Sequence, residues 1–202
     1  MEYLIVNGDK FQSDGNYVQL RGVGLGNWLN LEHFMFGLPG TDAQIRNMLY
    51  EVYGKQNAIE FWKIYYENYI SEKDIEYVAS LGLNHIRIPV NYKLFLTDDF
   101  DKSIAIKQID RLLEYCKKYD IWAIIDMHAV PGGQNPDWHS DNNTGMDNFW
   151  NNQDAMNLIV DLWTKIAEYY KQEKTIGGFD IINEPCYFNF EYDKSMIMFF
   201  EK

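Results

Sequence analysis

From residue 71 onward, short apolar runs alternate with longer segments in which apolar residues recur every three or four positions. The longer recurrence is typical of an α-helix that packs one face on a core, whereas a nearly continuous apolar run is typical of a strand buried on both faces. The pattern therefore predicts helices at 71–81, 101–118 and 153–171. It predicts strands at 83–90, 121–128 and 179–183. Another helix begins at 191–202.

The first 70 residues carry a different pattern. Apolar runs at 3–6 and 17–20 flank Asn-Gly and Asp-Gly turn signals, which predicts an N-terminal hairpin. A short strand at 21–27 then leads into a loop. The helical pattern over 41–68 is interrupted near Gly54, so two consecutive helices are expected there.

Strands that alternate with helices of ten or more residues imply a parallel sheet. Two architectures then compete, a doubly wound open sheet and a TIM (β/α)8 barrel, and periodicity alone does not separate them. Each of the last three predicted strands carries polar residues at its C-terminal side: Arg87, then Asp126 and His128, then Asn183 and Glu184. A barrel collects its active site from the C-terminal ends of several strands, so this placement favours the barrel.

Composition narrows the possible partners. The formal net charge of −12 argues against a nucleic-acid partner, because phosphate binding needs clustered Lys and Arg. No apolar run approaches the roughly 18 residues that a membrane span needs. The two cysteines, Cys116 and Cys186, indicate neither a disulfide framework nor a zinc finger. Residues 1–10 lack the pattern of a signal peptide, so a cytoplasmic location is expected.

The segment Gly22-Val-Gly24 is the nearest approach to a dinucleotide-binding fingerprint. That fingerprint needs a third glycine and a helix directly behind it, whereas loop residues follow here. We therefore expect no cofactor and no metal. Aromatic residues are abundant, with 15 Tyr, 12 Phe and 6 Trp, and their rings suit sugar faces and ordinary cores alike. Stacking on sugar and packing in the core both remain open for Trp138 and Trp150.

Four segments together resemble glycoside hydrolase family 5. They are Arg21-Gly-Val, Leu83-Asn-His-Ile-Arg-Ile-Pro89, Ile125-Asp-Met-His128 and Ile182-Asn-Glu-Pro185. Within that family, residues 27–32, 69–82 and 128–135 look most like the exo-β-1,3-glucanase group. The resemblance implies a TIM (β/α)8-barrel glycosidase fold.

The resemblance also implies hydrolysis of O-glycosyl bonds in β-glucans or related β-glycosides by a retaining mechanism. Two carboxylates then flank the bond, about 5–5.5 Å apart. By motif position Glu184 would be the acid/base, which protonates the leaving oxygen and later activates water. The family's nucleophile is a Glu at the end of the seventh barrel strand. The structural alternative for Glu184 is an acidic residue that opens the last helix.

The positions that correspond to the family's substrate contacts are Arg87, His128, Asn183, Glu32 and Asn143. Asn183 would bind the sugar 2-OH, and Arg87 would hold the nucleophile ionised and aligned. A surface ion pair for Arg87 and core packing for His128 are the alternatives. Asp126 shares a strand face with His128 and is expected to orient its neighbours. Successive strand residues point to opposite faces, so Asn183 and Glu184 can both serve only if the chain bends there.

A complete barrel takes about 250 residues, whereas these 202 reach just past the fourth strand. We expect one partial catalytic domain, with a hairpin at 1–20, βα units over 21–202 and no C-terminal half. Such a chain would serve polysaccharide catabolism as part of a full-length protein and would be inactive alone. A half-barrel that pairs with another chain and a non-catalytic carbohydrate-binding remnant are the alternatives. Open strand edges would favour self-association.

Overall fold

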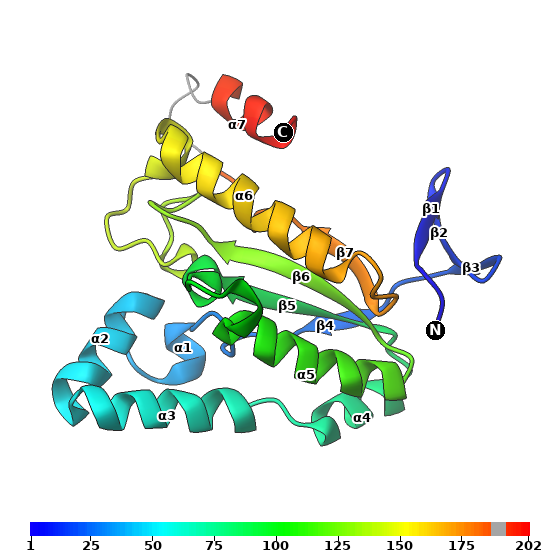
Figure 1. The fold of residues 1–202 in the computed structure, drawn as a ribbon, viewed down its shortest axis with the longest axis horizontal. Coiled ribbons are helices and arrows are strands. Elements are labelled where there is room, and N and C mark those ends of the chain that lie inside the picture. The colour runs from blue at the N-terminus through cyan, green and yellow to red at the C-terminus, as the bar shows by residue number, and fades with distance from the viewer. Residues whose placement is uncertain (187–192) are drawn as a thin grey trace.

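The computed structural model describes residues 1–186 and 193–202. Figure 1 shows a four-stranded parallel sheet in the order β4-β5-β6-β7 and a separate three-stranded antiparallel sheet in the order β1-β2-β3. The strands are β1 (Ile5–Asn7), β2 (Lys10–Ser13), β3 (Asn16–Val18), β4 (Gly22–Gly24), β5 (His85–Asn91), β6 (Trp122–Ala129) and β7 (Ile176–Asp180). The α-helices are α1 (His33–Phe36), α2 (Asp42–Tyr53), α3 (Lys55–Asn68), α4 (Glu72–Ser80), α5 (Ile104–Lys118), α6 (Gln153–Tyr170) and α7 (Asp193–Phe200).

Strand order separates the two architectures. Each parallel strand pairs with the next one along the chain, from Gly22 opposite His85 to Asp126 opposite Asp180. A doubly wound sheet would reverse its strand order at a switch point. Consecutive pairing is the arrangement within a (β/α)8 barrel. Within the described residues the sheet ends at β4 and β7 and is open.

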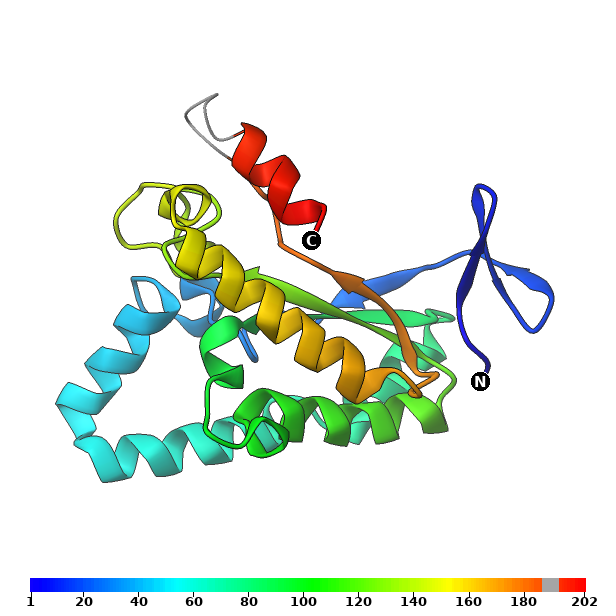
Figure 2. The same ribbon diagram turned by 45° about the horizontal axis from the view of Figure 1, so that its top comes forward.

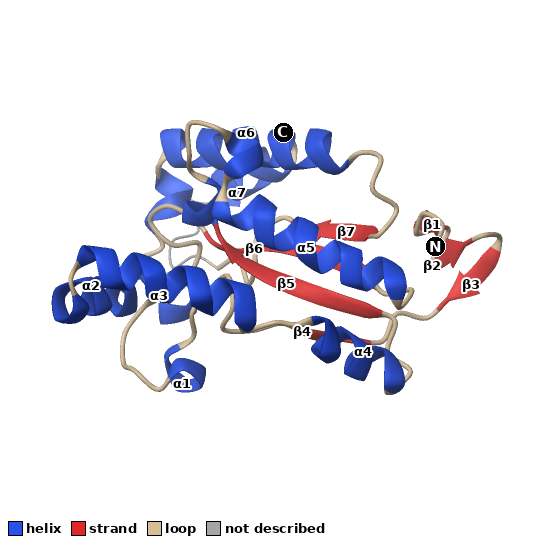
Figure 3. Ribbon diagram, turned by 60° about the horizontal axis from the view of Figure 1, so that its bottom comes forward, coloured by secondary structure: helices blue, strands red, loops and turns tan. Residues whose placement is uncertain are grey.

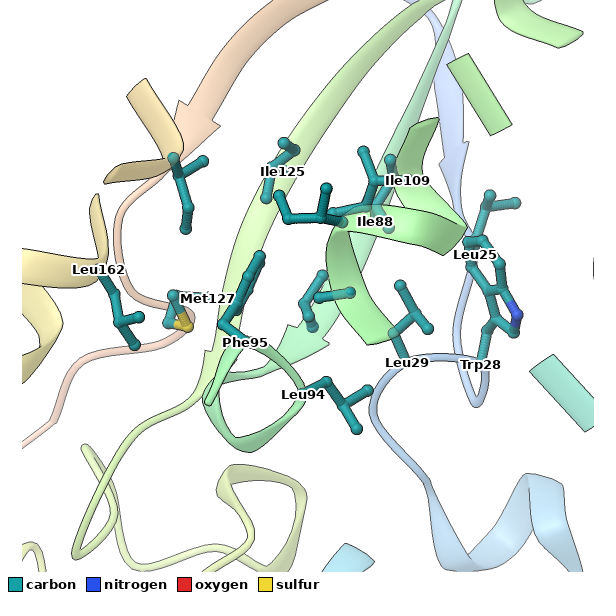
Figure 4. Packing of buried hydrophobic residues seen from close by; sticks show 14 of the residues in the cluster. Leu25, Trp28, Leu29, Ile88, Leu94, Phe95, Ile109, Ile125, Met127 and Leu162 are labelled. Atoms are coloured by element: carbon teal, nitrogen blue, oxygen red, sulfur yellow. The ribbon is translucent and has the colours of Figure 1, made fainter. Parts of the chain in front are cut away.

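The two faces of the parallel sheet carry different side chains. Helices α4, α5 and α6 run alongside the strands and cover one face (Figure 3). In Figure 4, Ile88 of β5 lies with Ile109 of α5, and Met127 of β6 lies near Leu162 of α6, all within one buried cluster. The alternating residues of β5 and β6, Arg87 among them, point to the other face. The apolar face therefore builds the core, and the polar face is left for the site.

Helices α2, α4, α5 and α6 begin directly after capping residues. Thr41 and Gln44 form a capping box at the start of α2, and Ser71 and Asp74 form one at α4. Helix α5 starts later than the pattern predicted, because a 3-10 turn precedes Ser103, whose hydroxyl accepts from the Ile106 N–H at 3.2 Å. Among the described residues, no helix combines the length and the apolar character that crossing a bilayer requires.

The N-terminal prediction was wrong in one respect. Residues 5–18 form three antiparallel strands rather than a two-stranded hairpin, because tight turns at Gly8 and at Asp14-Gly15 reverse the chain twice. Figure 2 shows this small sheet beside the end of the parallel sheet where the parallel strands begin. Lys174 joins it there to the body of the chain, with Nζ 2.7 Å from Glu2 Oε2.

Strand β7 also differs from the prediction. It covers Ile176–Asp180, not 179–183, and so begins earlier and ends before Asn183. The apolar pattern missed its start because Gly177 and Gly178 contribute no side chain. A Cβ at Gly177 would lie 2.9 Å from the Trp122 Cβ, so the close pairing of β7 with β6 requires glycine there.

Candidate active site

A group of charged and polar side chains lies on the open face of the sheet, toward the C-terminal ends of the strands. Arg87 comes from β5, Asp126 and His128 from β6, and Asp180 from β7. Parallel pairing thus brings Arg87, Asp126 and His128, which the sequence motifs predicted, to the same end of the sheet, together with Asp180, which the motifs did not indicate.

Arg87 bridges two carboxylates. Its Nη2 lies 3.0 Å from Asp126 Oδ2 and 2.8 Å from Asp180 Oδ2, and its Nε donates to the same Asp180 oxygen at 3.0 Å. Asp126 is fully buried and stands opposite Asp180 in the strand register. Two adjacent carboxylates repel one another, and the planar guanidinium between them offsets that repulsion.

His128 shares Asp126 with the arginine. Its Nδ1 lies 2.6 Å from Asp126 Oδ2, and the imidazole is almost entirely buried. Burial raises the pKa of the Asp126 carboxyl, while the hydrogen bond from His128 and the charge of Arg87 oppose that rise. Asp126 therefore links the orientation of His128 to that of Arg87.

Asn183 and Glu184 lie beyond the end of β7, in a bend. The Asn183 N–H donates to the Met127 carbonyl at 3.1 Å, so the chain still follows β6 there. Glu184 then takes a positive φ of 45°, a left-handed conformation that L-residues other than Gly adopt only occasionally. The strand ends and the chain bends at this point, which releases the two residues from strict alternation.

The bend directs the two side chains differently. Asn183 is buried, and its Oδ1 accepts from Arg87 Nη2 at 2.7 Å, whereas its Nδ2 has no partner among the described residues. The Glu184 side chain is 70% exposed. A buried amide with an unused donor beside an exposed carboxyl suits a site that receives hydroxyl groups.

The loop that follows β6 holds this bend in place. Gln134 Nε2 donates to the carbonyls of His128 at 2.8 Å and Asn183 at 3.0 Å. Asn135 Nδ2 donates to the Glu184 carbonyl at 3.0 Å. These two amides were not among the predicted site residues, although the resemblance of residues 128–135 to the family included them.

Trp150 supports the same bend from the core. Its Nε1 lies 2.9 Å from the carbonyl oxygens of both Gln134 and Cys186, and the residue is fully buried. A stacking platform must be exposed to sugar, so the structure excludes that role for Trp150 within this chain. Trp138 is only half-buried and packs edge-on against His33 and Phe34.

His139 is a further residue of this group that the sequence motifs did not indicate. Its Nε2 lies 3.3 Å from Glu184 Oε2, and its ring centroid lies 5.6 Å from that of His128. Burial lowers the pKa of His139, and the nearby charges of Glu184, Asp137 and Glu32 oppose this effect. The contact joins positions 139 and 184, so no local sequence signal could have revealed it.

The two remaining predicted residues lie in different surroundings. Glu32 is half-buried at the N-terminal end of α1, and its charge acts on His139, which places it at the same end of the sheet. Asn143 is exposed and borders a shallow hollow with His33 and Trp138. No hydrogen bond in the described part of the chain joins Asn143 to the group around Arg87. Within that same part, no three His, Cys, Asp or Glu residues are grouped as metal ligands.

Residues 40–190 match the family model described as cellulase (glycosyl hydrolase family 5). The chain belongs to glycoside hydrolase family 5. A beta-xylosidase of Phanerodontia chrysosporium is 40% identical over 190 residues, a match that covers 92% of this chain and 40% of that protein. Glucan 1,3-beta-glucosidase 2 of Wickerhamomyces anomalus is 32% identical over 197 residues, covering 88% of this chain and 45% of that protein. The family resemblance predicted from the motifs is confirmed.

The structure is similar to a rutinosidase from Aspergillus niger, with a TM-score of 0.68 and 22% sequence identity. That match covers 83% of this chain and 49% of the rutinosidase chain. Solved structures of this kind are TIM-barrel glycosidases. The open parallel sheet of this chain is therefore part of a TIM-barrel fold, and the predicted barrel architecture is confirmed. The chain of this family 5 member spans less than half the length of each of these three relatives.

Proposed function

We propose that this chain carries the acid/base side of a retaining β-glycosidase active site, acting on β-linked glucosides or closely related β-glycosides. One observation carries the proposal: the bend after β7 presents Glu184 to solvent while its neighbour Asn183 is fixed by Arg87. A carboxyl that must protonate a glycosidic oxygen has to reach the substrate, and the amide beside it has to stay aligned.

The chemistry needs two carboxylates in different roles. In the first step Glu184 transfers its proton to the leaving oxygen as the nucleophile attacks the anomeric carbon. In the second step the same carboxylate takes a proton from water, which attacks the anomeric carbon and releases the sugar. Asp126 is fully buried and does not reach a bound sugar, and the nucleophile that the family resemblance implies is a Glu, which neither Asp126 nor Asp180 is. The nucleophile is proposed to come from a seventh strand of a complete barrel.

The relatives support the substrate class. The similar proteins are a beta-xylosidase and a glucan 1,3-beta-glucosidase, whose names share a β-linked sugar and differ in the sugar itself. We therefore propose a β-linked oligosaccharide or polysaccharide as the substrate. The unused Nδ2 of Asn183 is the proposed donor to the 2-hydroxyl of the sugar whose bond is cleaved.

The test is Glu184→Gln in the protein expressed from its complete coding sequence. Turnover of an oligosaccharide with a poor leaving group should fall by about 10²–10⁴-fold, because it needs the proton. Turnover of a 2,4-dinitrophenyl β-glucoside should fall far less in its first step. Glu114→Gln, the same substitution at an exposed residue of α5, is the matched control.

Two results would overturn the assignment. Equal losses on both substrates would remove Glu184 from the acid/base role. Sugar binding by the wild-type protein without any turnover would favour the non-catalytic binding alternative instead.

A further inference from the structure

His139 stands in a short 3-10 turn, Trp138–Ser140, that the surrounding chain holds firmly. Asn30 Nδ2 donates to the His139 carbonyl at 3.0 Å. The Ser140 Oγ lies 2.7 Å from the carbonyl oxygen of Asp137 and 3.1 Å from that of Asn135, and its single proton is shared between them. The imidazole is therefore carried by a well-braced backbone, and its side chain is only 15% exposed.

The two ring nitrogens have different surroundings. Nε2 faces the Glu184 carboxylate at 3.3 Å, whereas Nδ1 is buried and has no hydrogen-bond partner among the described residues. A proton on Nδ1 would be a buried donor without an acceptor, which costs free energy. The neutral tautomer with the proton on Nε2 avoids this and donates toward Glu184.

We infer that His139 is a positioning residue for Glu184, which it holds through a hydrogen bond from the neutral imidazole Nε2–H to the carboxylate. The inference rests on the proposed acid/base role of Glu184. No other side chain of the described residues bonds to that carboxylate, and its large exposure leaves it free to adopt other rotamers. In the structure this contact is 3.3 Å long, and the proposed hydrogen bond selects one of these orientations.

The neutral state of the imidazole matters for the reaction. A fixed positive charge beside Glu184 would favour its ionised form strongly and would oppose the proton that the first step needs. A neutral donor stabilises the Glu184 carboxylate as the Glu184 proton moves to the glycosidic oxygen. The proton of the imidazole stays on Nε2 throughout. Glu184, Asp137 and Glu32 face His139 as acids, and His128 faces it as a base. Burial outweighs the three acids and lowers the pKa of His139, which supports the neutral form.

Two substitutions at position 139 distinguish the effect of the hydrogen bond from the effect of the ring shape. His139→Phe keeps a planar ring and removes the donor, whereas His139→Gln retains an N–H donor of similar reach. In the protein expressed from its complete coding sequence, His139→Phe should lower kcat on a poor leaving group by about tenfold at unchanged KM. The alkaline limb of its pH–rate profile should move to higher pH, because the ionised carboxylate has lost a donor. His139→Gln should restore most of both.

A second measurement needs no substitution at His139. The contact is reciprocal, so Glu184→Gln should lower the pKa of His139, since it removes a negative charge that favours the imidazolium. Nuclear magnetic resonance of histidine-labelled protein follows this titration directly. His85, at the opposite end of β5, is the internal control and should titrate unchanged.

The outcomes distinguish this inference from the proposed function. A His139→Phe protein that folds and keeps the wild-type kcat and pH profile would overturn the inference. Equal losses in His139→Phe and His139→Gln would overturn it too, because they would indicate packing rather than a donor. So would a His139 titration that Glu184→Gln does not move. If that titration moves while Glu184→Gln retains turnover of poor leaving groups, the contact stands and the acid/base role of Glu184 fails.

Discussion

The guanidinium of Arg87 on β5 and the carboxylate of Asp180 on β7 meet across the intervening strand β6, with Nη2 2.8 Å from Oδ2. The strand between them contributes Asp126, which the same guanidinium contacts at 3.0 Å. One arginine thus joins three neighbouring strands at the site and also contacts Asn183. The alignment of the residue beside Glu184 therefore depends on a network that spans the sheet.

Loss of this arginine should destabilise the chain. Arg87→Met would leave the buried Asp126 carboxylate without its cation, and the free energy of unfolding should fall by about 3–5 kcal/mol. Asp180→Asn should cost much less, because the Asp180 side chain is 38% exposed and Asp126 keeps its partner. Urea unfolding measures both. Glu168→Gln, which breaks an exposed pair with Lys171, is the control and should change stability by less than about 0.5 kcal/mol. A similar small loss in Arg87→Met would contradict the network.

The amide of Gln134 should matter for both stability and the site. Gln134→Leu would leave the carbonyls of His128 and Asn183 without their donor, at a cost of about 2–3 kcal/mol. Because these carbonyls flank the candidate catalytic residues, turnover by the protein from its complete coding sequence should also fall. The matched control is Gln153→Leu, because the Gln153 amide donates to the exposed Asn157 and to no other group in the described part of the chain. Chemical unfolding of the two variants in parallel tests the difference, and equal stability losses would argue against it.

Stability should decline as the pH falls below neutrality. Burial lowers the pKa of both His85 and His139 in the folded chain, so the unfolded chain binds more protons once the pH drops below about 6.5, the ordinary value for histidine. The stability that the two neutral histidines contribute is complete above that pH. It is lost as the pH falls toward their lowered pKa values in the folded chain. Thermal unfolding at pH 7 and pH 5 measures the loss. A variant with both His85→Gln and His139→Gln should lose less between these two values, and an unchanged loss would contradict the linkage.

The open edges of the parallel sheet should promote association of the 202-residue chain. Strands β4 and β7 each leave one edge unpaired within the described residues, and Val23 and Phe179 on them are 39% and 36% exposed. Such edges pair readily with other chains. Light scattering should report oligomers, and Val23→Lys should shift the distribution toward monomer. Exposed Val52 lies on helix α2, and Val52→Lys, the control, should not shift it. A monomeric wild-type chain would refute the expectation.

The sequence by itself determined the order and type of most elements. Amphipathic spacing and the break near Gly54 are local signals, and the structure shows local capping boxes at Thr41 and Ser71 where two of the helices begin. The motifs around Arg87, His128, Asn183 and Glu184 were sufficient to indicate the family, because each motif is a short run of consecutive residues on a strand or just beyond its end.

Only the tertiary structure decided which side chains work together. The apolar pattern missed the start of strand β7 because a glycine is required at position 177, where a Cβ would collide with Trp122, a residue on another strand. Asp180 meets Arg87 at a sequence separation of 93 residues, and His139 meets Glu184 across a bend whose positive φ at Glu184 no motif specified. Such contacts follow from strand register and loop path, which depend on the summed packing of the whole chain. The local sequence around either residue therefore carries no signal for the contact.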